Sequence, residues 1–333
     1  MQRPLSHAAA PLHDYRAPWW LPGGHAQTIW PALMSSRWSG PAPRYRRERW
    51  DTPDGDFVDV DVQHAADPHA RWLVLFHGLE GSSQGVYARG FAVAAAAAGL
   101  HYAVPHFRGC SGELNRAPRA YHSGDYEEIG WILERLRSRS TQPLWVVGIS
   151  LGGNALMRWA EEAGATAAAS AAAIASVCSP LDLAASGHAI GRGFNRWVYT
   201  RMFLRTMKPR ALGMLARHPG LFDRERLVAA RDLYEFDNVF TAPLHGFAST
   251  EDYWARASAK PLLHTIRIPA LALNSRNDPF VPAESLPRHG DVGDWVTLAQ
   301  PAHGGHAGFP GGALSDDVPA LPRGVLAWLQ AHP

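Results

Sequence analysis

The stretch Leu144-Trp145-Val146-Val147-Gly148-Ile149-Ser150-Leu151-Gly152-Gly153-Asn154 decides the fold class of this chain. Its apolar first half is typical of a buried strand, and good helix formers follow from Asn154 to Glu162. Between them lies Gly148-Ile149-Ser150-Leu151-Gly152, a G-x-S-x-G pattern at a sharp strand-to-helix turn. The two glycines lack the Cβ atoms that would collide in so tight a turn. The pattern therefore predicts a serine nucleophile, exposed at the carboxyl end of a strand and beside a helix N-terminus.

Strands and helices are predicted to alternate on both sides of this turn. The strand patterns occupy residues 72–76, 102–105, 172–177, 270–274 and 295–298, and the helical patterns occupy residues 87–98, 125–139 and 320–331. A hairpin is expected over residues 46–62, with Asp54-Gly55 as its turn. This alternation favours an α/β fold, in which a mostly parallel sheet carries helices on both faces and the hairpin adds an antiparallel edge.

Two segments of the chain do not follow the alternation of strands and helices. Because we find no interdomain linker, we expect residues 1–333 to form one domain. Residues 1–44 are rich in Pro, Trp and Gly. They are expected to form an ordered arm on the body, because an exposed cluster of Trp is unfavourable; the alternative is that these rings line a pocket. Residues from about 179 to 266 are aromatic and irregularly helical, too long a segment for an ordinary connection. We expect an inserted helical cap over the sheet edge where ligands of α/β proteins bind.

The composition is that of an ordinary soluble globular chain: of 333 residues, 46% are hydrophobic and 19% are charged. The formal net charge of +2 gives no reason to expect nucleic acid or an anionic surface as a partner. Cys110 and Cys178 are far apart and predict neither a disulfide framework nor a zinc site, so a reducing compartment is expected. There is no signal-peptide pattern and no apolar run of the roughly 18 residues that a spanning helix needs. A cytoplasmic chain without an integral membrane segment is therefore predicted.

Two later strands are each followed by a residue that fits a catalytic triad. A serine hydroxyl is a poor nucleophile near neutral pH, and it needs a His to take its proton and an acid to orient that His. With a turn of this kind, the expected order along the chain is Ser, acid, His. Asp278 follows the strand at 270–274, and His306 follows the strand at 295–298. Ser150, Asp278 and His306 are therefore the predicted catalytic residues.

The acid and the base each have a rival. His303 is the alternative base, but His306 is flanked by Gly305 and Gly308 in a loop able to bring it over the serine. Asp182 is the alternative acid, and its other expected role is to cap a helix or turn. The two histidines do not predict a metal site, because zinc needs three or more protein ligands and no partnering Cys or H-E-x-x-H pattern is present. No metal or cofactor is expected.

Two backbone N–H groups are expected to hold the oxyanion of a tetrahedral intermediate. One is the N–H of Leu151, directly after the nucleophile. The other is assigned to Leu79, in the loop His77-Gly78-Leu79-Glu80-Gly81 that follows an earlier strand. Gly78 would allow the close approach that this second donor needs.

Two further side chains near these loops have structural explanations. His77 is expected to order its loop by hydrogen bonding, in preference to a role in catalysis. Arg108, in His106-Phe107-Arg108-Gly109, is expected to form an internal ion pair with an acid such as Glu113 or Asp125. The alternative for Arg108 is a contact with a carboxylate or phosphate of a ligand.

The chain resembles the YheT-like branch of the α/β-hydrolase superfamily in motifs that run from near its N-terminus to its end. The matching segments are Gly23-Gly24-His25-Ala26-Gln27-Thr28, His77-Gly78-Leu79-Glu80-Gly81-Ser82, Phe107-Arg108-Gly109-Cys110-Ser111-Gly112, Gly148-Ile149-Ser150-Leu151-Gly152-Gly153-Asn154, Asn277-Asp278-Pro279 and His303-Gly304-Gly305-His306-Ala307-Gly308-Phe309. This resemblance implies an α/β-hydrolase fold, a Ser-Asp-His triad on Ser150, Asp278 and His306, and an esterase- or lipase-type activity.

The leading functional hypothesis is a serine esterase that cleaves a small-molecule carboxylic ester through an acyl-enzyme. The aromatic cap favours an apolar acyl chain. A thioesterase or amide hydrolase on the same triad is an alternative, since the geometry of acyl transfer is shared. A ligand-binding protein that has kept the fold without turnover is a further alternative, although no member of the triad is missing.

Overall fold

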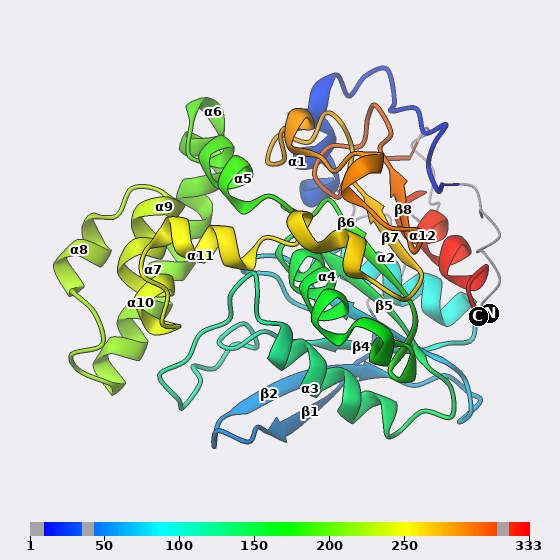
Figure 1. The fold of residues 1–333 in the computed structure, drawn as a ribbon, viewed down its shortest axis with the longest axis horizontal. Coiled ribbons are helices and arrows are strands. Elements are labelled where there is room, and N and C mark those ends of the chain that lie inside the picture. Colours follow the sequence, from blue (N-terminus) through cyan, green and yellow to red (C-terminus); the bar gives the residue numbers. More distant parts are fainter. Residues whose placement is uncertain (1–9, 35–42, 312–319) are drawn as a thin grey trace.

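The structure is a computed structural model that describes residues 10–34, 43–311 and 320–333, arranged around one sheet (Figure 1). The strands are β1 Arg46–Asp51, β2 Phe57–Gln63, β3 Trp72–Phe76, β4 His101–Pro105, β5 Leu144–Ile149, β6 Ala171–Val177, β7 Ala270–Leu273 and β8 Val296–Ala299. They lie in the order β1-β2-β4-β3-β5-β6-β7-β8. The β1–β2 and β2–β4 pairs are antiparallel, and all other neighbours are parallel. The predicted parallel sheet and antiparallel hairpin are confirmed.

Helices cover both faces of the sheet, as an α/β fold requires. The helices outside the β6–β7 connection are α1 Gly23–Met34, α2 Val86–Ala97, α3 Tyr126–Arg137, α4 Leu151–Ala163 and α12 Ala320–Gln330. Successive residues of a strand face opposite sides, so Val74 and Leu75 of β3 belong to different cores. Val74 packs in one core with Ile132 of α3 and Leu156 of α4, and Leu75 packs in the other core with Phe91 of α2.

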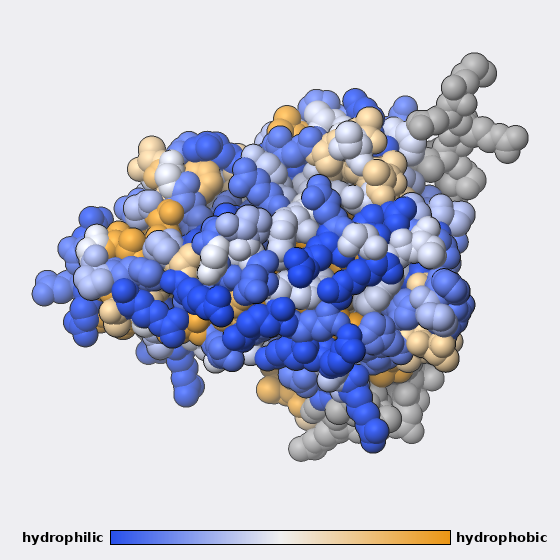
Figure 2. All heavy atoms as spheres, turned by 90° about the horizontal axis from the view of Figure 1, so that it is seen from below, coloured by the Kyte–Doolittle hydropathy of each residue, from blue (hydrophilic) through white to orange (hydrophobic). Residues whose placement is uncertain are grey.

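Between β6 and β7 the chain forms a helical insertion, residues 183–265, which occupies the left side of Figure 1. Its helices are α5 Leu183–Ile190, α6 Gly193–Asn195, α7 Arg201–Arg217, α8 Arg224–Ala229, α9 Leu233–Phe236, α10 Ala242–Leu244 and α11 Thr250–Ala257, with π-helical turns at Arg196–Thr200 and Asp237–Thr241. Figure 2 shows a mostly hydrophilic underside, with apolar residues gathered at the end formed by this insertion. Two statements stay predictions: that residues 179–266 act as a cap over the site, and that residues 1–333 form one domain.

The predicted N-terminal arm, residues 1–44, is only partly covered, because residues 1–9 and 35–42 lie outside the described residues. The part between them contains α1, which the sequence pattern does not predict. Trp20 and Trp30 pack edge to face with their ring centroids 5.0 Å apart, whereas Trp19 is 92% exposed. The expected packing of these rings is therefore only partly correct. Among the described residues, no helix is long and apolar enough to cross a membrane.

Candidate active site

The turn from β5 to α4 places Ser150 in a strained backbone conformation, with φ 53° and ψ −121°. Such strain costs about 1–3 kcal/mol and persists only where the surroundings hold it. Here the N–H of Ser150 donates to the carbonyl oxygen of Val177 in β6 over 2.8 Å. A Cβ on Gly148 would lie 2.5 Å from the carbonyl oxygen of Gly152, so this close approach of strand and helix requires glycine. The sharp strand-to-helix turn that the sequence predicts is present.

Asp278 and His306 are hydrogen-bonded to each other beyond the carboxyl ends of β7 and β8. Oδ2 of Asp278 is 2.8 Å from Nδ1 of His306. Oδ1 of Asp278 accepts from the backbone N–H groups of Phe280, at 2.8 Å, and Val281, at 3.3 Å. The carboxylate is therefore held by its own loop, and it orients the imidazole through Nδ1. Nε2 of His306 is left to exchange a proton with another group.

One pocket brings the predicted site residues together. Ser150, Leu151, Leu79 and His306 all border it, and Asp278 is hydrogen-bonded to His306. The loop of Leu79 lies close to the serine, because a Cβ on Gly78 would be 3.2 Å from that of Ser150. In residues 10–34, 43–311 and 320–333, no acceptor is bonded to the N–H of Leu79 or Leu151. The geometry suits two donors beside a nucleophile, and the catalytic roles stay predictions.

The two rival residues lie elsewhere in the structure. His303 is exposed, with Nδ1 3.5 Å from the side-chain nitrogen of Asn277. Asp182 caps α5, where Oδ1 accepts from the N–H of Ala185 over 3.0 Å. Neither belongs to the described residues that border the pocket of Ser150. The geometry therefore favours His306 and Asp278 over these alternatives.

His77 orders its loop, as expected. The ring is buried, its Nδ1–H donates to the carbonyl oxygen of Gly78 over 2.8 Å, and its Nε2 accepts from the N–H of Phe107 over 3.1 Å. Burial lowers the pKa of His77 to about 3, so the ring is neutral and both nitrogens keep these opposite roles. The Tyr87 hydroxyl also accepts from the N–H of Gly78 over 3.0 Å. The loop that carries Leu79 is thus fixed from two sides.

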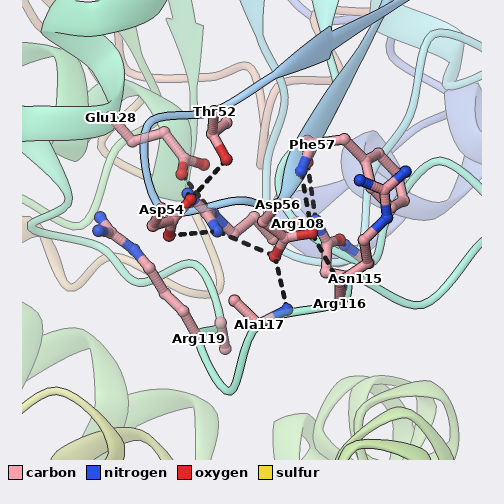
Figure 3. Close-up of polar contacts among 12 residues, drawn as sticks. Thr52, Asp54, Asp56, Phe57, Arg108, Asn115, Arg116, Ala117, Arg119 and Glu128 are labelled. Atoms are coloured by element: carbon pink, nitrogen blue, oxygen red, sulfur yellow. Dashed lines mark hydrogen bonds and ion pairs between the residues drawn. The ribbon is translucent and has the colours of Figure 1, made fainter.

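Arg108 forms an internal ion-pair network, but its partners are not the acids expected (Figure 3). The partners are Asp54 at 2.8 Å, Asp56 at 3.0 Å and Glu128 at 2.5 Å. Glu113 and Asp125 pair with other arginines. The hairpin turn and α3 both contact the loop after β4. These contacts cannot be predicted from the spacing of the residues in the sequence. Because three carboxylates surround the guanidinium of Arg108, its positive charge is already compensated and is not available to bind an anionic ligand.

The start of α1 supports the loops of Asp278 and His306, which sequence reasoning missed. The Gln27 side chain is 1% exposed, and its Oε1 accepts from the side-chain NH₂ of Asn277 and the N–H of Gly304, each over 2.9 Å. Thr28 Oγ1 accepts from the N–H of His306 over 2.8 Å. The only signal in the sequence is the Gly23-Gly24-His25-Ala26-Gln27-Thr28 motif itself, which carries no chemistry of its own.

A second contact missed from the sequence joins the helical insertion to the loop of Leu79. Arg210 of α7 forms an ion pair with Glu80, the residue after Leu79. The N–H of Glu80 donates to the Tyr121 hydroxyl over 3.0 Å, and that hydroxyl donates to the Glu80 carboxylate over 2.9 Å. Glu80 also has a positive φ of 57°. These contacts fix the backbone beside a predicted oxyanion donor.

Comparison with known proteins defines the class. The family profile of the alpha/beta hydrolase fold matches residues 71–313, which include every strand from β3 to β8. The chain is 38% identical to "Putative esterase YheT" from Escherichia coli, over 92% of this chain and 90% of that protein. It therefore belongs to the YheT-like branch of the α/β-hydrolase superfamily, and the resemblance seen in the sequence motifs is confirmed.

More distant proteins extend this result. The chain is 27% identical to human "Phospholipase ABHD3" over 98% of its own length and 80% of that protein. Among solved structures, the Pyrococcus furiosus esterase Pf2001 aligns with a TM-score of 0.51 and 15% identity, covering 86% of this chain and 88% of that one. The structural match shows a shared fold alone. The relatives are an esterase and a phospholipase by name.

Proposed function

We propose that this chain is a serine hydrolase that cleaves carboxylic esters through an acyl-enzyme on Ser150. The observation that supports it is the hydrogen-bonded Asp278–His306 pair, whose imidazole borders the same pocket as a strained, glycine-flanked serine. A buried acid that orients a histidine in the same pocket as a serine is the arrangement that activates the serine hydroxyl. The names of the esterase and phospholipase relatives support ester chemistry.

The proposed reaction has two halves, formation of the acyl-enzyme and its hydrolysis, and the same site residues act in both. Nε2 of His306 takes the proton of Ser150 as the serine oxygen attacks the ester carbonyl carbon, and Asp278 stabilises the imidazolium. The N–H groups of Leu79 and Leu151 donate to the oxyanion, where the loss of one such donor typically costs about 3–4 kcal/mol. Collapse expels the alcohol, which takes the proton from His306. Water then attacks the acyl-enzyme with the same general base and releases the acid.

The pocket favours an uncharged, apolar acyl chain. Apolar side chains of the helical insertion form much of its wall, including Ile190, Phe203, Met207, Met214, Phe236 and Phe240. Its arginines, Arg108, Arg119 and Arg210, are each ion-paired with an acid. Asp237 also borders the pocket, and burial raises its pKa to about 6, so it is mainly ionised at neutral pH. An anionic substrate would therefore meet no free cation there.

Labelling with a fluorophosphonate tests the proposal directly. This reagent phosphonylates an activated serine, and digestion followed by mass spectrometry should place the adduct on Ser150. Ser123 and Ser186 border the same pocket and serve as internal controls. An adduct on either of them, or an unmodified protein after long incubation, would reject Ser150 as the nucleophile.

Replacing Asp278 by asparagine should lower kcat by about 10⁴-fold, because an amide cannot stabilise the imidazolium and favours the wrong tautomer of His306. The matched control is Asp182→Asn, which should leave kcat close to that of the parent protein because Asn caps helices as well as Asp does. Rates of hydrolysis of a short p-nitrophenyl ester measure both. Similar losses of kcat in the two variants would show that Asp278 is not the acid that orients His306 in catalysis.

Replacing Gln27 by methionine should lower kcat roughly 10- to 100-fold without a comparable change in KM, since the loops of Asp278 and His306 lose a shared acceptor. The variant should also lose about 2 kcal/mol of stability, because the N–H of Gly304 is left buried and unpaired. Steady-state kinetics and urea unfolding measure the two effects. Gln84→Met, at an exposed position, is the matched control and should change neither. An unaltered kcat in Gln27→Met would show that α1 does not position the site.

A further inference from the structure

One face of the helical insertion exposes large apolar side chains to solvent. Phe194 is 53% exposed, Trp197 is 68% exposed and Met202 is 54% exposed. Together with Val198, Arg201 and Arg205, which are also exposed, they define the outward stripe. They lie along one continuous helical segment, which runs from α6 through the π-helical turn at Arg196–Thr200 into the first turns of α7, and it is their exposure that places them together on the solvent side. Soluble chains rarely gather apolar side chains in this way without an interaction that covers them.

The charge of this segment differs sharply from that of the whole chain. Residues 191–220 contain six Arg, one Lys and no Asp or Glu, although the complete chain has a net charge of only +2. Two of these arginines, Arg201 and Arg205, belong to the stripe, whereas Arg210 is paired with Glu80 on the pocket side. The guanidinium carbon of Arg201 is 5.3 Å from the ring centroid of Trp197. Within the part of the chain that the structure describes, neither Arg201 nor Arg205 forms an ion pair with an acid. The stripe therefore offers free positive charge together with apolar surface.

The stripe continues from α6 and the π-helical turn onto α7, and the other face of α7 borders the candidate active site. Phe203, Met207 and Arg210 of α7 line the pocket, while Met202 and Arg205 face solvent. A single helix thus separates the stripe from the pocket, a distance of about 10 Å. A surface that covers the stripe would lie directly beside the pocket wall.

We propose that the outward stripe docks this protein peripherally on the surface of an anionic phospholipid bilayer. Trp, Phe and Met side chains insert among acyl chains and head groups, while Arg side chains pair with phosphates, which is the composition that holds a helix in the plane of a bilayer interface. The absence of acids across residues 191–220 favours this occupant over a neutral apolar partner, which would gain nothing from the arginines. The docking does not depend on ester hydrolysis.

Vesicle sedimentation tests this proposal with the full chain carrying Ser150→Ala, so that turnover cannot alter the lipid. The protein should co-sediment with phosphatidylglycerol–phosphatidylcholine vesicles and much less with phosphatidylcholine alone, and added salt should release it. In Arg201→Gln/Arg205→Gln, the partition coefficient should fall about fivefold for each arginine. Phe194→Ser/Trp197→Ser should bind anionic vesicles at least tenfold more weakly.

The matched control is Arg224→Gln/Val228→Ser on α8, an exposed arginine and an exposed apolar residue of the same insertion, and it should bind like the parent. Thermal unfolding of each variant reports whether it is folded. Equal binding by stripe and control variants, or no binding of the parent to anionic vesicles, would overturn the proposal. A further result would also overturn it: the parent forms a concentration-dependent dimer, and the stripe variants lose this dimer while their vesicle binding is unchanged. The stripe would then be the contact surface for a second copy of the chain.

Discussion

Ser150→Ala should abolish hydrolysis of short p-nitrophenyl esters, lowering kcat by on the order of 10⁶-fold. Ser150 is the only residue of the proposed triad that forms a bond to the substrate, and alanine offers no oxygen for attack. The change removes one atom from an elbow whose backbone is held by Val177, so the protein should fold and melt as the parent does. Hydrolysis is followed by release of p-nitrophenolate against a no-enzyme blank.

Ser186→Ala is the matched control, because Ser186 also borders the pocket but lies on α5, away from the elbow. It should retain most of the activity. Substantial turnover by Ser150→Ala would reject the acyl-enzyme on this residue. Loss of activity in Ser186→Ala together with full activity in Ser150→Ala, with unchanged melting of both, would point to Ser186 as the nucleophile.

His306→Ala should be almost as damaging, because a serine without its general base stays protonated and the leaving alcohol receives no proton. The imidazole of His306 borders the pocket and is oriented by Asp278 over 2.8 Å. His303→Ala should retain substantial activity, since His303 is exposed and outside the pocket wall. The comparison is made by steady-state kinetics and by the rate of fluorophosphonate labelling. If His303→Ala were the inactive variant of the two, the roles of the histidines would be exchanged.

The sheet and the candidate triad could be predicted because they follow from local patterns. Each parallel strand is an apolar run that ends in a polar loop, and the carboxyl ends of parallel strands meet at one edge. Asp278 and His306, each placed after such a strand, therefore had to approach the serine that follows β5. No distant contact needed to be known.

The parts that escaped prediction depend on contacts between distant segments. The partners of Arg108 lie in the hairpin turn and on α3, while nearer acids in the sequence pair elsewhere. The role of Gln27 depends on Asn277, which is 250 residues away. The outward stripe could not be predicted for a different reason. The sequence indicates a helical segment over residues 194–205, but only the packing of the folded chain shows which of its side chains are left uncovered.

The docking of α1 has a consequence for how the chain acquires its site during synthesis. Thr28 and His306, which are hydrogen-bonded, are separated by 278 residues, so a ribosome releases α1 long before the loops that receive it. Until those loops emerge, Oε1 of Gln27 and Oγ1 of Thr28 lack the backbone and side-chain donors that they have in the native structure. Closing so long a span costs chain entropy that only the final contacts offset. The loops of Asp278 and His306 should therefore be among the last parts to order, and refolding should restore the sheet before it restores the candidate site.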